Sequence, residues 1–139
     1  MTISEVAERY GLTPDTLRYY ERAGLIPPVR RTEGGQRDYT DESCRWVDFA
    51  RCMRGAGLPV EALAQYVALF RQGDATASQR LAILREQREL LAARMADMQA
   101  TLDRLDFKIA RYDAILLPRE QELAQSLATS AQEHASARR

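Results

Sequence analysis

The feature that most limits the fold of this chain is a long stretch without helix-breaking residues. From Asp74 to Leu117 the sequence contains no glycine and no proline, which favours one continuous helix. Along this stretch apolar residues recur at alternating spacings of three and four, interrupted only by Arg88. Such an a/d heptad seam predicts a coiled coil. The seam positions are Leu81, Leu84, Leu91, Met95, Met98, Leu102, Leu105, Ile109, Tyr112 and Leu116.

The predicted helix is too long to bury its seam within one small chain. A helix over residues 74–118 spans on the order of 60 Å at ~1.5 Å per residue. An intramolecular hairpin is disfavoured, because nothing between residues 80 and 117 is expected to break the helix. We therefore expect the seam to pair with that of a second copy, giving a homodimer. The seam alone does not set the orientation of the two helices.

The C-terminal residues 119–139 differ in composition from the seam. They are rich in Ala, Ser, Gln and Glu and hold few large apolar residues, so we expect a flexible or frayed tail. His134 is the only histidine of the chain, and one histidine does not make a metal site. We therefore expect no metal and no cofactor.

The N-terminal residues carry the signals of two short helices joined by a turn. Thr2 and Glu5 form a capping-box pattern, and Gly11 is placed to end the first helix. Thr13 suits the N-cap of a second helix, with Pro14 at its first position. Helix, glycine-containing turn and second helix is the helix-turn-helix pattern, in which the second helix enters the major groove of DNA. Alone, the pattern is only moderately specific.

The residues after the second helix predict a small β-hairpin. Two consecutive prolines forbid continuation of the helix, and residues 29–32 and 37–39 can pair as strands around two adjacent glycines. A hairpin in this place makes the motif a winged helix-turn-helix. Both the hairpin and the second helix carry arginine and tyrosine, which suits a grip on nucleic acid. The predicted DNA-contacting residues are Thr13, Arg18, Tyr19, Tyr20, Arg31, Arg37, Tyr39 and Arg54.

Two of these assignments have competing explanations. Tyr20 either contacts DNA or packs behind Leu17. Arg54 lies at the end of a predicted helix over residues 40–57, which is followed by another over residues 59–71. It either binds a phosphate in a second wing, formed by the turn over residues 54–57, or is a solvated arginine favoured by the helix dipole. In the first of these helices we expect the centre of the core, formed by Trp46, Phe49, Ala50 and Met53.

The sequence resembles the MerR family of transcriptional regulators over roughly residues 1–70. The resemblance rests on the runs TLRYYERAGLIPP, GGQRDY and TDESCRWVDFARCMRGAGLP, and on the long helix that follows them. It implies a mainly α fold, with a winged helix-turn-helix DNA-binding domain in residues 1–73 and an antiparallel coiled-coil dimerisation helix in residues 74–118. It also implies a palindromic double-stranded promoter operator, distortion of that DNA, and RNA polymerase as a partner.

Cys44 and Cys52 both lie in the third predicted helix. On a helix their Cα atoms are ~12 Å apart, beyond the ~7 Å that a disulfide allows. Arginines beside Cys52 favour the reactive thiolate, but most free cysteines are small hydrophobes at a core's edge, and chemistry alone favours that second interpretation. The run FARCMRGAGLPVEALAQYVALFRQGD resembles the thiol-based branch of the family that answers aldehydes, nitric oxide and related electrophiles, which implies that Cys52 is the sensor. An adduct at a packed edge would overpack it.

Composition places few limits on the partners. The formal net charge is +0, so the whole-chain charge gives no evidence for nucleic acid. Lys108 is the only lysine; the bias toward arginine suits bidentate recognition of phosphate and guanine or reflects a GC-rich genome. No apolar run approaches the ~18 residues of a membrane span, and the N-terminus has no signal-peptide core. These features predict a cytoplasmic protein with no membrane contact, and the family resemblance implies a bacterial, nucleoid-associated one.

Together these features predict a homodimeric regulator that activates transcription by distorting DNA when Cys52 senses an aldehyde, a quinone or nitric oxide. Two alternatives stay open: an architectural DNA-binding dimer without sensing and, remotely, a thiol enzyme that uses Cys52. The enzyme is disfavoured because no histidine or other base lies near Cys52 in the sequence. We predict that the protein is not an enzyme.

Overall fold

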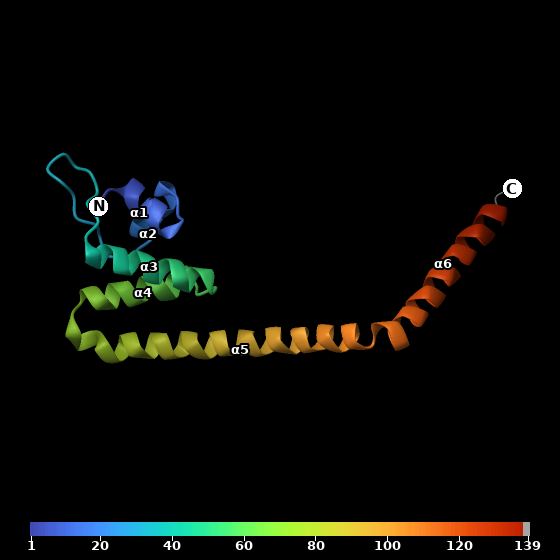
Figure 1. The fold of residues 1–139 in the computed structure, drawn as a ribbon. Coiled ribbons are helices and arrows are strands. Elements are labelled where there is room, and N and C mark those ends of the chain that lie inside the picture. The colour runs from blue at the N-terminus through green and yellow to red at the C-terminus, as the bar shows by residue number, and fades with distance from the viewer. Residues whose placement is uncertain (138–139) are drawn as a thin grey trace. The chain divides into compact units, whose positions relative to one another are not determined.

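The computed structural model describes residues 1–137, and it divides into two compact units, Met1–Ala93 and the residues from Arg94 onward (Figure 1). The mainly α fold predicted from the sequence is confirmed. Within the described part of the chain, none of the helices combines the length and apolar character that a membrane span requires. The elements are α1 (Ile3–Tyr10), α2 (Pro14–Arg22), α3 (Asp41–Gly55), α4 (Val60–Arg71), the 3₁₀ turn η1 (Asp74–Thr76), α5 (Ala77–Ala110), the π-helical turn η2 (Tyr112–Leu116) and α6 (Leu117–Ala137).

Helices α1 and α2 form the predicted helix-turn-helix, and both begin at the predicted caps. The Thr2 hydroxyl accepts from the Glu5 N–H while the Glu5 carboxylate accepts from the Thr2 N–H, which completes the capping box. Gly11 ends α1 with a φ of 66°, a left-handed conformation that glycine adopts without steric cost. Thr13 caps α2 by accepting from the Thr16 N–H at 3.1 Å. These contacts satisfy backbone groups that helix ends otherwise leave unpaired.

The core of the first unit lies between α1, α2 and α3. On α3 the face that packs inward carries small and β-branched residues, including Val47 and Ala50. Trp46, Phe49 and Met53 were expected at the centre of the core but are only half-buried, because they lie on the flanks of that face. The prediction is thus wrong for these three residues and right for Ala50. The buried cluster comprises Val6, Ala7, Leu17, Tyr20, Leu25, Ile26, Val29, Tyr39, Cys44, Val47, Ala50, Leu58 and Leu63.

Between α2 and α3, residues 29–39 form a hairpin loop, which we call the wing (Figure 1). Helix α2 already ends at Arg22, before the two prolines. The two predicted strands do not form: in the described residues the β pairing is a single antiparallel bridge between Arg31 and Arg37. Of the two glycines at the tip only Gly35 has a positive φ, 81°. The wing is too short for a regular ladder, so side chains must hold it in place.

Helix α5 carries the predicted seam, and most seam side chains are exposed in the single chain. Met98 is 73% exposed and Leu84 is 36% exposed, whereas Leu91 is half-buried. Aligned apolar side chains left open to water along a helix indicate an interaction surface. The structure therefore leaves this face available for a partner helix.

The sequence predicted one unbroken helix over residues 74–118. The structure instead has a break at Arg111, so this prediction is wrong. Arg111 leaves helical geometry with φ −110° and ψ 9°, and the π turn η2 then leads into α6. Pro118 accounts for this break, because proline has no N–H to donate to the carbonyl four residues earlier and its ring clashes with that carbonyl. The predicted tail, residues 119–139, is helical throughout its described part, and residues 138–139 lie outside the described residues. The predicted boundaries of the three domains stay predictions.

Candidate nucleic-acid interface

The solvent side of α2 carries two arginines and a tyrosine. Arg18 and Tyr19 are exposed, and the Arg22 guanidinium carbon lies 5.6 Å from the centroid of the Tyr19 ring, within cation–π range. Arg18 and Arg22 are four residues apart, so they project from the same side of the helix. Guanidinium groups and a phenol in this arrangement can donate to phosphates and to base edges.

Arg18 is oriented by Asp15 one turn earlier. Arg18 Nη1 donates to Asp15 Oδ1 at 2.7 Å, and these side chains are 46% and 94% exposed. An exposed ion pair between residues three apart contributes little free energy, so Arg18 can exchange Asp15 for an acceptor on DNA. Thr13, also exposed, stays at the cap, where its hydroxyl lies 2.9 Å from that of Thr16.

Tyr20 and Tyr39 are core residues, not surface residues. Their exposed fractions are 6% and 2%, and the Tyr39 hydroxyl is fully buried with no hydrogen-bond partner in the described residues. Burial raises the pKa of both phenols. This placement contradicts a direct DNA contact by Tyr39, because its hydroxyl cannot reach a phosphate while the core is intact. For Tyr20, the alternative of packing with Leu17 in the core is the one observed.

Glu21 of α2 fixes the wing to the helix. Its Oε2 accepts from the Val29 N–H at 2.6 Å and its Oε1 from Arg37 Nε at 2.7 Å, while Arg31 Nη2 lies 4.0 Å from Oε1. Burial opposes ionisation of this carboxyl, but the Val29 N–H and the Arg37 guanidinium outweigh it and lower the pKa of Glu21. We call these four residues the wing latch. Glu21 was not among the predicted residues, because no local pattern reveals that a loop later in the chain folds back on it.

Asp38 makes a second connection at the base of the wing. Arg30 and the Met1 amino group donate to its two carboxylate oxygens, the amino group at 3.1 Å. The hydrogen bond from Arg30, followed by that from Met1, lowers the pKa of Asp38. The Met1 amino group also donates to the Tyr39 carbonyl at 2.9 Å, and the Tyr39 N–H donates to the Met1 carbonyl at 2.8 Å. The base of the wing is thereby fixed to the residues that precede α1.

The remaining predicted arginines differ in accessibility. Both Arg37 and Arg31 belong to the wing latch, but Arg37 is 20% exposed and lies 2.7 Å from Glu21, whereas Arg31 is 49% exposed, lies 4.0 Å from Glu21 and donates Nη1 to the Gly35 carbonyl at 3.0 Å. Arg31 is therefore the more accessible cation of the wing. Arg54 donates Nη1 to the Leu58 carbonyl at 2.7 Å and closes the turn between α3 and α4. Neither explanation drawn from the sequence included this structural role.

The two cysteines of α3 have contrasting environments. Cys44 is buried in the core and Cys52 is exposed. The expectation that Cys52 sits at a packed edge is therefore wrong for the single chain, and an adduct on its sulfur would enlarge a surface. Arg51 beside it is held by Asp48 at 2.6 Å, a hydrogen bond that raises the pKa of Arg51. Within residues 1–137, no group of three or more His, Cys, Asp or Glu is placed to hold a metal ion.

The chain matches models of one known family over the residues that hold this candidate interface. A model described as MerR HTH family regulatory protein matches residues 1–69, and one described as MerR, DNA binding, matches residues 44–107. A solved structure from Listeria monocytogenes, described as a MerR family transcriptional regulator, is 48% identical with a TM-score of 0.81, covering 94% of this chain and 98% of that chain. The chain belongs to the MerR family of transcriptional regulators.

Two further relatives of this MerR-family chain are a curated regulator and a regulator solved with DNA. The HTH-type transcriptional regulator AdhR of Bacillus subtilis is 53% identical over 91 residues, which cover 66% of this chain and 65% of AdhR, slightly less than two thirds of that protein. The structure of HiNmlR, a MerR family regulator lacking the sensor domain, bound to promoter DNA, is 30% identical with a TM-score of 0.73, covering 81% of this chain and 89% of that chain. The chain is thus a DNA-binding transcriptional regulator and not an enzyme.

Proposed function

We propose that this MerR-family protein works as a homodimer that binds a palindromic promoter operator, activates transcription by distorting the DNA, and responds to a reactive electrophile through Cys52. We place it in the bacterial cytoplasm, on the nucleoid, with RNA polymerase as a further partner. The observation that carries the DNA-binding part is the exposed pair Arg18 and Tyr19 on a capped helix beside a latched wing. The likeness to HiNmlR, whose structure contains promoter DNA, supports it.

In this proposal α2 enters the major groove and the wing follows the phosphate backbone. Arg18 reads a base edge, because its weak pair with Asp15 is easily exchanged. Arg31 contacts a phosphate from the wing. At the N-terminal end of α2 the exposed hydroxyl of Thr13 is placed to contact a second phosphate.

Dimerisation in this proposal uses the exposed seam of α5. Met95, Met98, Leu102 and Leu105, with Asp97, Gln99 and Thr101 beside them, line an open groove of about 620 Å³ on this helix; we expect a second helix to cover its apolar side chains. By resemblance to the family, the two helices run antiparallel. A dimer of this kind presents two α2 helices to half-sites about one helical turn of DNA, ~34 Å, apart or at multiples of that distance.

Sensing is assigned to Cys52 because it is the exposed cysteine of the chain. Its thiolate would add to the electrophilic carbon of an aldehyde or quinone. A C–S bond forms as the C=O π bond of the aldehyde, or the conjugated C=C π bond of the quinone, breaks, and the oxygen that receives the electron pair takes a proton. Cys52 lies in the last turns of α3, just before the turn to α4 that Arg54 closes. Smoothly bending an operator costs about 1–6 kcal/mol, so an adduct at Cys52 would alter the DNA distortion if it changed the free energy of the bent state by part of that amount.

The competing function is a dimer that shapes DNA without sensing, and peptide mapping by mass spectrometry separates the two. The protein is treated with an aldehyde or a quinone, and operator footprints are recorded on the same samples. We expect the adduct on the peptide with Cys52 and not on that with Cys44, with unchanged occupancy and an altered footprint at the operator centre. An unmodified Cys52, or an adduct that leaves the footprint unaltered, would favour the architectural function.

A further inference from the structure

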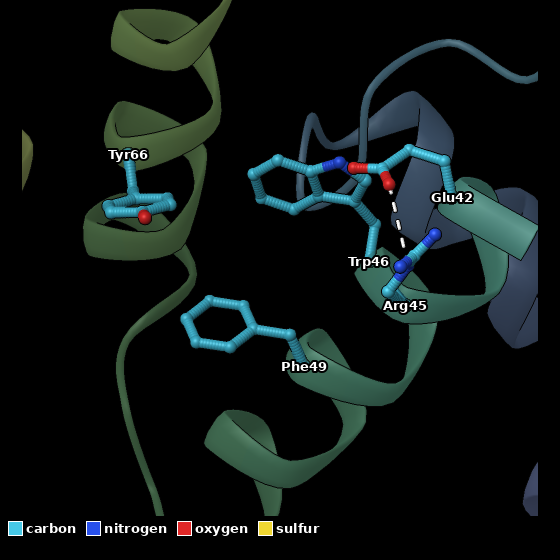
Figure 2. A pocket seen from close by; sticks show the side chains of 5 residues that line it. All are labelled: Glu42, Arg45, Trp46, Phe49 and Tyr66. Atoms are coloured by element: carbon cyan, nitrogen blue, oxygen red, sulfur yellow. Dashed lines mark ion pairs between the residues drawn. The ribbon is translucent and has the colours of Figure 1, made fainter.

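A pocket between α3 and α4, on the flank of the core, has no role in the proposed function (Figure 2). Glu42, Arg45, Trp46 and Phe49 of α3 line it, together with Tyr66 of α4. The four α3 residues are spaced i, i+3, i+4 and i+7, so they share one face of the helix. The cavity measures about 200 Å³, below the ~300–1,000 Å³ of sites for drug-sized ligands. It therefore suits a small head group.

Three aromatic rings meet at this pocket, as Figure 2 shows. The ring centroids of Trp46 and Phe49 are 6.3 Å apart with their planes at 89°. The Tyr66 centroid lies 6.1 Å from Trp46 and 5.8 Å from Phe49. Rings this close together can all lie within ~6 Å of one bound cation, the range in which cation–π attraction is significant. All three residues are half-buried, so the pocket stays open to solvent.

The pocket also holds a carboxylate that is only weakly engaged. Arg45 Nε lies 3.4 Å from Glu42 Oε2, and the two side chains are 73% and 63% exposed. An exposed pair of this kind contributes little free energy. A cation bound among the rings can therefore take Glu42 as its counter-charge while Arg45 turns into solvent. A matched ion pair, Asp48 with Arg51, lies on the same helix but does not line the pocket. It can therefore serve as a control for the loss of a carboxylate from α3.

We propose that this pocket binds a small organic cation with a quaternary ammonium head group. The negative ring faces and Glu42 favour positive charge and disfavour an anion. A quaternary ammonium has no N–H to satisfy, which suits a site made mostly of rings. A metal ion would need several oxygen ligands, and Glu42 is the one carboxylate among the lining residues.

Trp46 is the only tryptophan of the chain, so its fluorescence reports directly on the pocket. The full chain is titrated with choline chloride or with its neutral isostere 3,3-dimethyl-1-butanol, at constant ionic strength. We expect a saturable change in emission with choline, with a Kd on the order of 1 mM. Because the alcohol fills the same space without charge, its binding should be at least about fivefold weaker.

Substitutions in the pocket show which side chains bind choline. Glu42→Gln and Phe49→Leu should each weaken choline binding about two- to fivefold, whereas Arg45→Gln should strengthen it by removing the competing cation. Asp48→Asn breaks the matched ion pair and should leave the affinity unchanged. Glu42 is exposed, so Glu42→Gln keeps the test valid if Phe49→Leu fails to fold.

Three results would overturn the proposal. One is the absence of a saturable response to choline, and another is an equal response to the neutral alcohol. The third is a Trp46 emission that shifts with protein concentration and is insensitive to choline, which would mean that a second copy of the chain covers the pocket.

Discussion

At the level of single residues, the wing is held to α2 by the carboxylate of Glu21. Backbone pairing contributes one bridge, whereas Glu21 accepts from Val29 and Arg37 at 2.6 and 2.7 Å and is only 14% exposed. Hydrogen bonds to a charged, shielded acceptor are stronger than those between neutral groups. Glu21 therefore holds the wing to α2, while Asp38 holds the base of the wing to Met1.

Glu21→Gln tests the wing latch through stability. We expect the free energy of unfolding to fall by about 1–2 kcal/mol at neutral pH, because Arg37 loses its charged acceptor. The folded-state pKa of Glu21 lies below its ordinary value of 4.5, so the stabilisation is present above that value and is lost as the pH falls through the folded-state pKa. Urea titrations across this range should show the difference from the wild type shrinking in acid.

The exposed wing-tip residue Glu33 provides the matched control for charge. Glu33→Gln removes the same charge without touching the latch and should leave stability unchanged at every pH. A Glu21→Gln protein as stable as the wild type at neutral pH would mean that the latch does not hold the wing.

Arg18→Ala and Arg31→Ala separate base reading from phosphate contact. Arg18→Ala should cost about 1–3 kcal/mol of operator binding and relax the preference at one base pair. Arg31→Ala should weaken binding to all DNA sequences by the same factor. It should also reduce the slope of log binding constant against log salt concentration by about one unit, as the loss of one phosphate contact does. Footprinting titrations at several salt concentrations measure both. Unchanged binding by both variants would rule out this interface.

At the level of elements, the sequence predicted features that depend on neighbouring residues, such as the helix caps, better than features that depend on distant ones. The caps at Thr2 and Thr13 fix the starts of α1 and α2, and both are formed as predicted. The strands of the wing were predicted from turn residues, but a ladder needs pairs along both arms, and these arms are too short. The inward face of α3 could not be chosen by hydrophobicity alone, since the core takes Val47 and leaves the larger Trp46 on the flank.

The predicted pairing of the α5 seam with a second copy cannot be seen in a single chain and stays a prediction. Leu102 lies in the middle of the seam and is 50% exposed. In the proposed dimer, Leu102→Asp places an unpaired charge in a buried contact on both chains, which should weaken association by more than about 2 kcal/mol. Sedimentation at micromolar concentration should then find monomers. Ala100→Asp adds the same charge off the seam and should stay dimeric; a dimeric Leu102→Asp protein would show the coiled-coil assignment to be wrong.

At the level of the whole molecule, the sequence predicted the family and the DNA-binding helix but not every contact residue. The exposure of Arg18 and Tyr19 on α2 agrees with the sequence, because they follow a recognisable cap, and their contact with DNA stays a prediction. Tyr39 was assigned to DNA from its place in the wing, although the fold buries it at 2% exposure. Glu21 was missed because its partners come from a loop whose path depends on tertiary structure. Residues whose role depends on distant chain segments are the ones that sequence patterns do not reveal.

In the proposed function this MerR-family regulator switches transcription through Cys52. The most direct test is run-off transcription from the protein's own upstream DNA, with and without an aldehyde, using the wild type, Cys52→Ala and Cys44→Ala. We expect the aldehyde to activate transcription with the wild type and with Cys44→Ala. We expect Cys52→Ala to bind the operator normally but not to respond. Full activation by aldehyde in the Cys52→Ala protein would contradict sensing by Cys52, because the signal would then enter the protein elsewhere.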